Sequence, residues 1–155
     1  MNRYIQLISL VCAGVGLASS AYAQTTWNVS LWGKPRYFTN HVEKVAELVK
    51  EKTNGDFVLK LHYGQALFKT RENLDGISID AFEMAQTCLV YHPGKTPISA
   101  SLTSLPYLFP NDDIREIGAV QSKSHTLPIV KKELAKWNAR ILMPSPLTLY
   151  NLVGK

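Results

Sequence analysis

Alternating apolar and polar positions mark two strands near the start of the chain. Residues 27–32, WNVSLW, and 57–62, FVLKLH, follow the period-two pattern of half-buried strands. Residues 40–53 between them follow a helical period instead. Four apolar positions of this segment share one helix face at the i, i+3, i+4, i+7 spacing: Val42, Val45, Ala46 and Val49. A strand, a helix and a strand at this spacing predict a right-handed crossover between parallel neighbours.

Local signals bound this first helix. Asn40 and Glu43 are spaced as a capping box at its start. Asn54 and Gly55 follow its last turn and favour the left-handed conformation that ends a helix. The sequence therefore predicts a helix that begins at residue 40 and ends just before the Asn-Gly pair.

The pattern then repeats with weaker signals. Thr70 is placed to cap a helix over residues 70–79, which Gly76 weakens by about 1 kcal/mol relative to alanine. A buried strand follows over residues 81–85, and then a polar loop that returns to the core through an apolar SLPYLFP segment. The remaining predicted elements are two helices, 112–122 and one capped by Thr126 that ends near Trp137, and two strands, 140–143 and 150–153. The predicted class is α/β with a mainly parallel sheet and flanking helices.

The first 23 residues have the features of a secretory signal peptide. Arg3 supplies a positive charge, residues 5–17 are mostly apolar, and Ala21-Tyr22-Ala23 forms an A-x-A cleavage site. We therefore expect export to the periplasm and a mature chain that begins at Gln24. Removing 23 of the 155 residues leaves 132, which corresponds to one domain.

Charge and cysteine content exclude several classes of function. The net charge of +5 is spread over scattered basic residues, with no basic run or nucleic-acid motif, so we expect no nucleic-acid partner. Cys88 is the only cysteine after residue 23, which rules out an intramolecular disulfide in the mature chain. The four histidines lack metal-ligand spacing, and no phosphate loop, nucleophile elbow or paired carboxylates occur. We expect neither a metal nor a cofactor, and no catalytic residues.

The candidate site lies where three loops follow the carboxyl ends of the predicted strands, residues 32–37, 64–69 and 86–91. In open parallel sheets, small molecules bind at this edge. Arg36 could hold a carboxylate in a bidentate contact. The other candidates supply polar donors or aromatic faces for a ligand, with simple packing as the alternative for each: Trp32, Tyr37, Gln86, Thr87 and Tyr91.

The order of these segments resembles a known family. Residues 31–85, LWGKPRYFTNHVEKVAELVKEKTNGDFVLKLHYGQALFKTRENLDGISIDAFEMA, followed by SLPYLF, resemble the periplasmic solute-binding subunits of TRAP transporters, the DctP family. The resemblance extends over nearly the whole mature chain. It implies a two-lobed protein, expected to be monomeric, that closes around a small organic acid and delivers it to the permease subunits in the membrane. It implies no cofactor and no catalysis.

The resemblance also implies that the chain is the N-terminal portion of such a protein. Family members are about twice as long, so residues 24–146 correspond to the first lobe and 147–155 to the start of the strand that crosses to a second lobe, which is missing. The arginine that grips the solute would lie beyond Lys155. In the family, the crossing strand contacts the solute at a position that is often a basic residue. The resemblance places Tyr150 at that position. A solute less anionic than a dicarboxylate would fit this tyrosine.

Two other classes of function remain open at this stage. An exported enzyme could use the loop from Gln86 to His92, with Cys88 or His92 as nucleophile or base. A ligand-sensing module would carry a signalling domain in place of a second lobe. Turnover would distinguish the first alternative, and the sequence downstream would distinguish the second. We also expect the chain to be poorly soluble alone, because the family's first sheet is completed by a strand from the second lobe.

Overall fold

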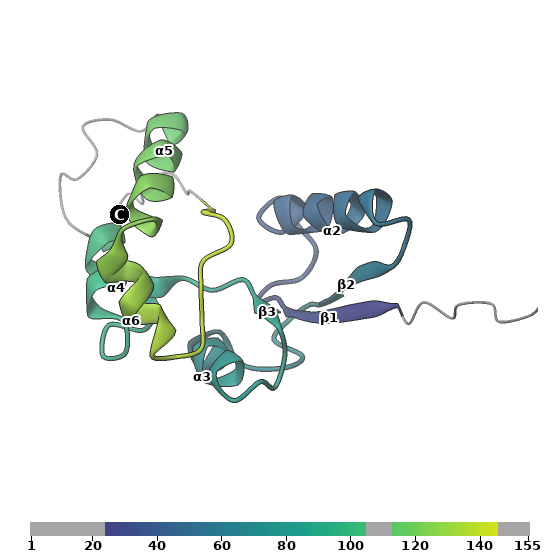
Figure 1. Cartoon of the computed structure of the whole chain (residues 1–155), viewed down its shortest axis with the longest axis horizontal. Helices are drawn as coiled ribbons and strands as arrows, with labels where there is room; N and C mark the ends of the chain where they lie inside the picture. The colour runs from purple at the N-terminus through teal and green to yellow at the C-terminus, as the bar shows by residue number, and fades with distance from the viewer. Residues whose placement is uncertain (1–23, 105–112, 146–155) are drawn as a thin grey trace, which may run out of the picture.

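Three parallel strands form the sheet around which the first half of the chain is arranged (Figure 1). The computed structural model describes residues 24–104 and 113–145. The strands are β1 (Thr25–Ser30), β2 (Phe57–His62) and β3 (Met84–Ala85), in the order β2-β1-β3. Both neighbours of β1 run parallel to it. The predicted α/β class with a mainly parallel sheet is therefore confirmed.

The register brings the carboxyl ends of the three strands to one level. Ser30, the last residue of β1, pairs with His62 of β2 and with Ala85 of β3. The predicted third strand, 81–85, is shortened to its last two residues because only these pair with β1. The loops that follow the three strands consequently start side by side, as the sequence predicts.

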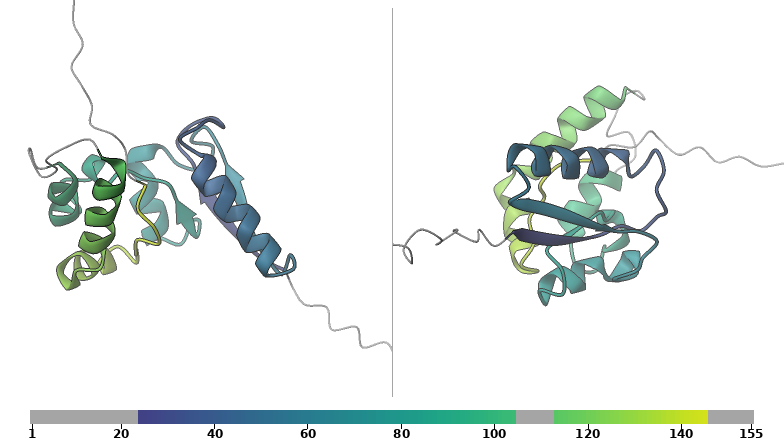
Figure 2. Two further views of the ribbon diagram at one scale, coloured as in Figure 1. Left: turned by 90° about the horizontal axis from the view of Figure 1, so that it is seen from above. Right: turned by 90° about the vertical axis from the view of Figure 1, so that its right-hand side faces the viewer.

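Helix α2 (Asn40–Lys52) covers one face of the sheet, as the predicted helical face requires (Figure 2). Its buried Val42 joins the core formed with the strands, and the other three predicted positions pack around that core. The buried members of this core come from β1, the residue that follows it, α2 and β2: Val29, Leu31, Val42 and Leu59. Burial of this apolar face, at about 25 cal/mol per Å², holds α2 against the sheet.

The predicted capping box of α2 is wrong by one residue. Thr39, not Asn40, precedes the helix, and it is fully buried. Its Oγ1 accepts a hydrogen bond from Arg36 N at 3.0 Å and lies 2.8 Å from Glu43 Oε1, to which it can donate. Glu43 therefore binds the capping residue through its side chain. The predicted stop is confirmed, because the segment Asn54–Gly55 turns at φ 49° and 86°.

The second crossover contains a divided helix. The predicted helix 70–79 is a 3₁₀ turn, η1 (Thr70–Glu72), followed by α3 (Asn73–Ser78). Thr70 lies inside this turn and is not its cap. The buried Asn73 begins α3 and accepts a hydrogen bond at Oδ1 from Ser30 Oγ at 2.8 Å. Local capping rules miss this junction because it depends on a polar contact with a residue 43 positions earlier.

Gly76 in α3 provides room for a buried aromatic ring. A Cβ at this position would lie 2.4 Å from Phe82 Cε1 and 2.6 Å from Cζ. Phe82 is 2% exposed and packs edge-on against Phe68, with ring centroids 5.3 Å apart. The ring cannot yield without disturbing its neighbour. The sequence accounts for Gly76 only as a weak helix position, whereas the structure gives it a packing role.

Gly76→Ala is therefore expected to destabilise the protein. Alanine would gain about 1 kcal/mol in helix propensity, but an overpacked core costs about 1–3 kcal/mol. We expect a net loss of up to about 2 kcal/mol in the free energy of unfolding, measured by urea titration. Gly94→Ala is the matched control, since a Cβ there meets no atom within 4 Å. Equal stabilities for wild type and Gly76→Ala would contradict this packing role.

Helices dominate the second half of the described chain. After the 3₁₀ turn η2 (Leu89–Tyr91) come α4 (Pro97–Ser104), α5 (Ile114–His125) and α6 (Pro128–Ala135). Figures 1 and 2 show α4, α5 and α6 grouped together, away from α2 and β2. This group has its own buried apolar side chains: Ala100, Ile117, Val130 and Leu134.

Three predictions for this half are wrong. The segment that becomes α4 was predicted as loop. Thr126 ends α5, and α6 instead begins after Leu127, with Pro128 in its first turn. The predicted strand 140–143 has no regular structure, because no strand pairs with it among the residues that the structure describes. The predicted strand 150–153, the segment 147–155 and the signal peptide 1–23 lie outside those residues.

A buried carboxylate joins α6 to α4. Glu133 of α6 is 4% exposed and reaches the first turn of α4. Its two oxygens accept hydrogen bonds from Ile98 N and Ser99 N, both at 2.8 Å, and from Ser99 Oγ at 2.6 Å. The first N–H groups of a helix need acceptors from outside its regular hydrogen bonding, and the negative charge also complements the positive end of the helix dipole. Glu133 thus acts as the cap of a helix 35 residues earlier.

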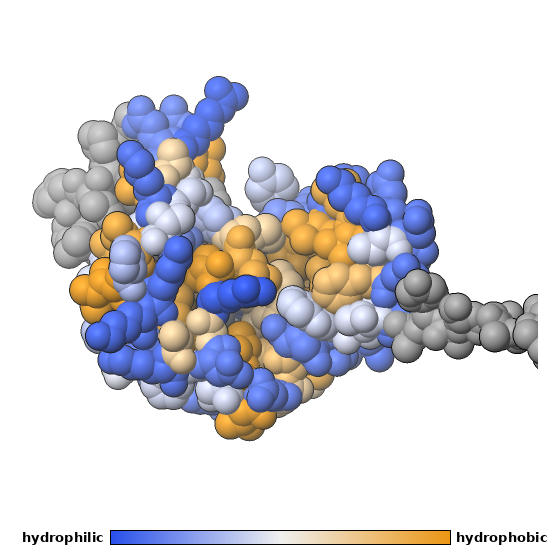
Figure 3. Space-filling model, in the orientation of Figure 1, coloured by the Kyte–Doolittle hydropathy of each residue, from blue (hydrophilic) through white to orange (hydrophobic). Residues whose placement is uncertain are grey.

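The surface carries apolar side chains between the two halves. On the face shown in Figure 3, apolar residues gather where the sheet and α2 meet the group of α4 to α6. Several large apolar side chains of the helical group and the segment after it are more than 40% exposed: Ile114, Val120, Leu127, Ile129 and Leu142. None of the described helices is long and apolar enough to cross a membrane.

Candidate functional site

Backbone hydrogen bonds hold the three loops after the strands together. Gly64 N donates to Gly33 O at 2.9 Å, and Gln65 N donates to Leu31 O at 2.9 Å, so the loop after β2 lies against the loop after β1. The β3 loop is held in turn where Gln86 N donates to a β1 carbonyl at 2.9 Å. The predicted meeting of the three loops at the carboxyl edge of the sheet is therefore confirmed.

An aromatic cluster lies at this edge, formed by Trp32, Phe38 and Tyr91. The ring centroids of Trp32 and Phe38 are 5.2 Å apart, and those of Trp32 and Tyr91 are 5.9 Å apart. All three side chains are half-buried. Two of them come from the loop after β1 and one from η2, after β3. The cluster therefore joins two loops that are more than 50 residues apart in the sequence.

Two guanidinium groups stack on this aromatic cluster. Arg36 Cζ lies 5.8 Å from the Trp32 ring centroid and 5.7 Å from that of Phe38. Arg71 Cζ lies 5.8 Å from the Tyr91 ring centroid. Within the described ranges, neither arginine forms an ion pair. Stacking fixes the plane of a guanidinium while its N–H groups stay available, so both arginines can receive an anion.

Thr39 fixes the position of Arg36. Arg36 O accepts a hydrogen bond from Thr39 N at 2.8 Å, and Arg36 N donates to Thr39 Oγ1 at 3.0 Å. The loop is further restricted on the other side, because a Cβ at Gly33 would lie 2.9 Å from Arg36 Nη2. The start of α2 and the absence of a side chain at residue 33 together position this guanidinium over the aromatic rings.

Gln86 is buried beneath the loop after β1. It is 9% exposed, and its Nε2 donates to Phe38 O at 3.1 Å and lies 3.4 Å from His41 Nε2. Burial lowers the pKa of His41, while its contact with the Phe38 backbone raises it. The net lowering favours the neutral ring, which can accept from Gln86. The amide thus connects the end of β3 to the residues that carry the aromatic cluster.

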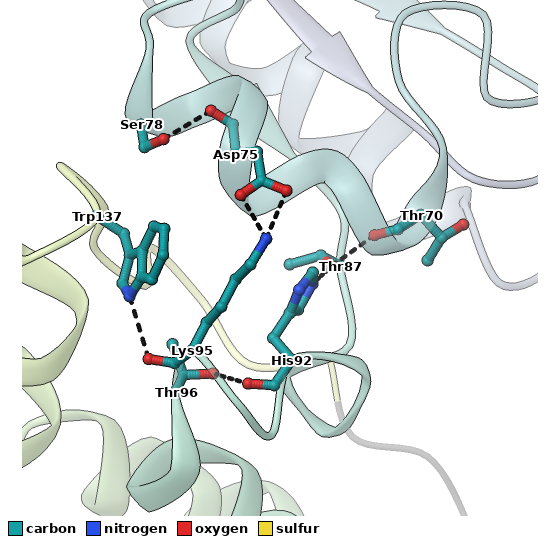
Figure 4. Close-up of polar contacts among 8 residues, drawn as sticks. All are labelled: Thr70, Asp75, Ser78, Thr87, His92, Lys95, Thr96 and Trp137. Carbon is teal, nitrogen blue, oxygen red and sulfur yellow. Dashed lines mark hydrogen bonds and ion pairs between the residues drawn. The ribbon is translucent and has the colours of Figure 1, made fainter.

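Thr87 belongs to a second group of polar contacts (Figure 4). Its Oγ1 lies 3.0 Å from Nε2 of His92 and 3.4 Å from Thr70 O. Burial lowers the pKa of His92, and the nearby Lys95 lowers it further. A histidine that is 3% exposed and neutral serves here to hold the loop.

Lys95 connects three elements within the same group. Its Nζ forms an ion pair with both carboxylate oxygens of Asp75 in α3 and lies 5.4 Å from the ring centroid of Trp137 (Figure 4). Trp137 Nε1 donates to Lys95 O at 3.1 Å. The charge of Lys95 is therefore already compensated by Asp75. This group joins α3, the β3 loop and the end of α6, and we assign it a structural role.

The remaining predicted site residues divide as follows. Tyr37 is 92% exposed and makes no ring contact with the cluster, whereas its neighbour Phe38 does. Tyr150 lies outside the described residues. Of the seven candidates, the structure brings together Trp32, Arg36 and Tyr91, with Gln86 beneath them.

Sequence reasoning missed Phe38, which belongs to the aromatic cluster, and Arg71, which stacks on it. Arg71 falls two residues beyond the predicted second loop and looks like an ordinary charged residue at a helix start. Phe38 follows Tyr37, and nothing in the local pattern indicates which ring of the pair turns inward. Phe38 reaches the cluster through Trp32, which lies after β1, and Arg71 reaches it through Tyr91 of η2. Both contacts depend on the tertiary positions of these elements. Phe38 directly precedes Thr39, the capping residue of α2. An apolar residue at this position often packs inward, and this signal could have indicated Phe38.

The geometry does not support the alternative of an enzyme built on the loop from Gln86 to His92. Cys88 is half-buried, and burial raises the pKa of its thiol despite a backbone hydrogen bond involving Val90 that lowers it. A nucleophilic cysteine needs a lowered pKa. The ring of His92 is paired through Nε2 with Thr87 Oγ1, at 3.0 Å. No group of three or more potential metal ligands occurs among the described residues.

Several solved structures of solute receptors share this fold. An extracytoplasmic solute receptor of Bordetella pertussis that binds pyroglutamic acid matches with a TM-score of 0.60 and 20% identity, over 73% of this chain and 36% of its own. A marine-metagenome TRAP solute-binding protein specific for pyroglutamate matches with a TM-score of 0.60 and 20% identity, over 74% and 36%. A TRAP periplasmic solute-binding protein from a Sulfitobacter species, with bound β-D-galacturonate, matches with a TM-score of 0.55 and 19% identity. The match covers 70% of this chain and 37% of that protein.

These matches assign the fold, which is that of a lobe of a TRAP-type periplasmic binding protein. The model of the bacterial extracellular solute-binding protein family 7, DctP, matches residues 30–142, and the chain belongs to this family. The family consists of solute-binding receptors and not of enzymes. The chain spans about a third of the length of the receptors that it resembles. The comparison with curated proteins gave no match.

Proposed function

We propose that the protein is the extracytoplasmic solute-binding subunit of a TRAP-type transporter and that it captures a small carboxylated solute at the aromatic cluster. The observation that carries this proposal is the pair of stacked arginines. Arg36 and Arg71 lie on the aromatic rings at the carboxyl edge of the sheet without a carboxylate partner among the described residues. An anionic solute would supply the missing charge-assisted hydrogen bonds.

Each part of the cluster has a distinct role in the proposed site. Arg36 binds the carboxylate, and its stacking on two rings keeps the guanidinium in place before the solute arrives. Trp32 and Tyr91 form an aromatic wall for the body of the solute. Arg71 lies at the far end of that wall, over Tyr91, and raises the local concentration of anions. Tyr150 completes the site from the segment that crosses to a second lobe.

Transport follows from closure around the solute. A second lobe closes over the site and excludes water, which strengthens the ion pair with Arg36. A solute drives this closure only to the extent that it binds the closed state better than the open one. The closed form then engages the permease subunits in the membrane. Residues 1–23 direct the protein to the periplasm as a cleavable signal peptide.

The similar receptors support a solute with a single carboxylate. Pyroglutamate carries one carboxylate and a lactam, galacturonate carries one carboxylate and several hydroxyls, and both are bound by proteins of this fold. An uncharged tyrosine at position 150 is consistent with a solute that carries a single negative charge. We therefore expect monocarboxylates to bind more tightly than dicarboxylates.

Thermal-shift measurements with a matched panel of compounds test the proposal. The panel contains pyroglutamate, galacturonate, succinate and 2-pyrrolidone, which is pyroglutamate without its carboxylate. A ligand at 100 times its Kd stabilises a protein by about 2.7 kcal/mol, which is several degrees in Tm. We expect at least one monocarboxylate to raise Tm while 2-pyrrolidone does not. Equal shifts for pyroglutamate and 2-pyrrolidone, or none for any acid, would contradict carboxylate capture.

A further inference from the structure

Arg36 is held at its backbone and at its guanidinium by two buried residues of the same loop. Its N–H donates to Thr39 Oγ1 at 3.0 Å, and its carbonyl accepts from Thr39 N at 2.8 Å. The guanidinium lies close to Gly33, where a Cβ would be 2.9 Å from Arg36 Nη2. Thr39 and Gly33 are both buried. The position of Arg36 therefore depends on what holds Thr39 and Gly33.

The carboxylate of Glu43 joins Thr39 to the loop after β2. Glu43 Oε1 lies 2.8 Å from Thr39 Oγ1 and 3.0 Å from Tyr63 Oη, and both hydroxyls can donate to it. Thr39 has a single hydroxyl proton, and Arg36 O also lies 2.9 Å from its oxygen. That carbonyl already accepts from Thr39 N, and a charged acceptor forms the stronger bond. We therefore assign the proton to the bond with Glu43, which leaves the Thr39 oxygen to accept from Arg36 N.

Tyr63 is well placed to anchor this carboxylate. It directly follows β2, is half-buried, and packs its ring against the core between the sheet and α2. Burial raises the pKa of its phenol, and the hydrogen bond to Glu43 raises that pKa further. The hydroxyl consequently keeps its proton at neutral pH and remains a donor.

The loop after β2 also holds Gly33. Gly64, the residue after Tyr63, donates from its N–H to Gly33 O at 2.9 Å. The backbone of Gly64 turns at φ 66°, a conformation that favours glycine. These contacts close into a ring, which we call the Arg36 ring: Arg36, Thr39, Glu43, Tyr63, Gly64 and Gly33.

We propose that Tyr63 and Glu43 are positioning residues for solute binding, which hold Arg36 in place through the Arg36 ring without contacting the solute. The inference rests on the role proposed for Arg36. Ordering a long side chain during binding lowers affinity, because rotamer freedom is lost at that step. A ring that restrains Arg36 before the solute arrives removes part of this cost. The loops after β1 and β2 then act as one rigid part of the site.

Calorimetric titration of Tyr63→Phe tests this inference. The variant removes only the hydroxyl and keeps the ring in the core. The probe is pyroglutamate or galacturonate, whichever raises the Tm of the wild type more. We expect its Kd to rise about three- to tenfold, which corresponds to the net contribution of one hydrogen bond. Glu43→Gln, which keeps an acceptor oxygen without the charge, should raise the Kd in the same direction.

Thr53→Val is the matched control, because Thr53 makes comparable contacts at the opposite end of α2. Its Oγ1 donates to Val49 O at 2.8 Å and accepts from Phe57 N at 3.1 Å. Loss of these bonds should lower the Tm of the protein without solute. The Kd should stay unchanged, because Thr53 does not belong to the Arg36 ring.

The backbone amide of Arg36 reports on the ring in the absence of solute. Its N–H donates to Thr39 Oγ1, so its signal in a proton–nitrogen correlation spectrum should shift in Tyr63→Phe. The shift is expected because removing one of the two donors to Glu43 changes the bond that Thr39 makes with this carboxylate. The amide of Phe57 donates to Thr53 Oγ1 in the same way and should keep its position.

The outcomes separate this inference from the proposed function. If the acid binds and Tyr63→Phe leaves its Kd unchanged, the positioning role is overturned and carboxylate capture stands, whether or not the Arg36 signal shifts. If Tyr63→Phe and Thr53→Val raise the Kd in proportion to their losses of Tm, the hydroxyl acts through general stability and the inference is again overturned. If the wild type binds no acid of the thermal-shift panel, both proposals fail.

Discussion

Glu133→Ala is expected to lower the free energy of unfolding by about 3–5 kcal/mol, because each hydrogen bond to a charged group contributes about 1.5–3 kcal/mol. The substitution removes three hydrogen bonds to the carboxylate, two from the backbone of the first turn of α4 and one from the Ser99 side chain. It also creates a cavity between α6 and α4. Domains of this size are stable by about 5–15 kcal/mol, so the loss is a large fraction of the total.

Urea titration followed by circular dichroism measures this loss. Glu51→Ala is the control, because Glu51 is exposed on α2 and such substitutions usually change stability by less than about 0.5 kcal/mol. Glu133→Gln should give an intermediate loss, since an amide has one oxygen to accept with. Similar stabilities for Glu133→Ala and Glu51→Ala would show that the contact between α6 and α4 contributes little.

The pH dependence of stability provides a separate test of Glu133. Burial alone would raise the pKa of this carboxyl, but the hydrogen bonds from Ser99 and Ile98 outweigh it, and the pKa lies below its ordinary value of 4.5. The folded state therefore holds the proton more weakly than the unfolded state. The stabilisation is complete above about pH 4.5 and is lost as the pH falls through the folded-state pKa. The difference between wild type and Glu133→Gln should shrink over that interval.

Arg36→Ala is expected to weaken binding of a carboxylate solute by about 30- to 700-fold, or about 2–4 kcal/mol. The substitution removes the cation that stacks on Trp32 and Phe38. The solute carboxylate would then be buried without a charge-assisted partner. Arg36 is exposed, so we expect little change in the Tm of the protein without solute. A loss of affinity without a loss of stability is the signature of direct binding.

Two further variants test the role assigned to Arg36. Lys34→Ala removes a neighbouring exposed positive charge in the same loop and should reduce affinity by less than threefold, through weaker long-range attraction alone. Arg36→Lys keeps the charge but loses the planar fork and the stacking, and should recover only part of the affinity. If Lys34→Ala and Arg36→Ala weaken binding equally, the total charge of the loop determines affinity. The direct contact assigned to Arg36 would then be wrong.

The parts of the fold that the sequence predicts are those with strong local periodicity. The helical spacing of Val42, Val45, Ala46 and Val49 and the alternation in WNVSLW and FVLKLH predict α2, β1 and β2 in their observed order. Helix α4 was missed because its sequence, PISASLTS, has no clear apolar face and follows a Pro/Gly loop. Its start is stabilised by Glu133, 35 residues away, which no local pattern reveals.

The candidate site was predictable at the level of loops but not of individual side chains. The parallel order of strands places the loops after residues 30, 62 and 85 together, which led to Trp32, Arg36, Gln86 and Tyr91. Thr87 adjoins Gln86 in sequence yet faces His92, because successive residues of an extended segment point in opposite directions. Which neighbour faces the site depends on where β3 ends.

A crystal structure of the protein with the acid that gives the largest thermal shift tests the central claim most directly. The account predicts the solute against the rings of Trp32 and Tyr91, with its carboxylate within hydrogen-bond distance of the Arg36 guanidinium. The claim would be contradicted by a solute bound away from the carboxyl edge of the sheet, or by one whose carboxylate contacts neither Arg36 nor Arg71.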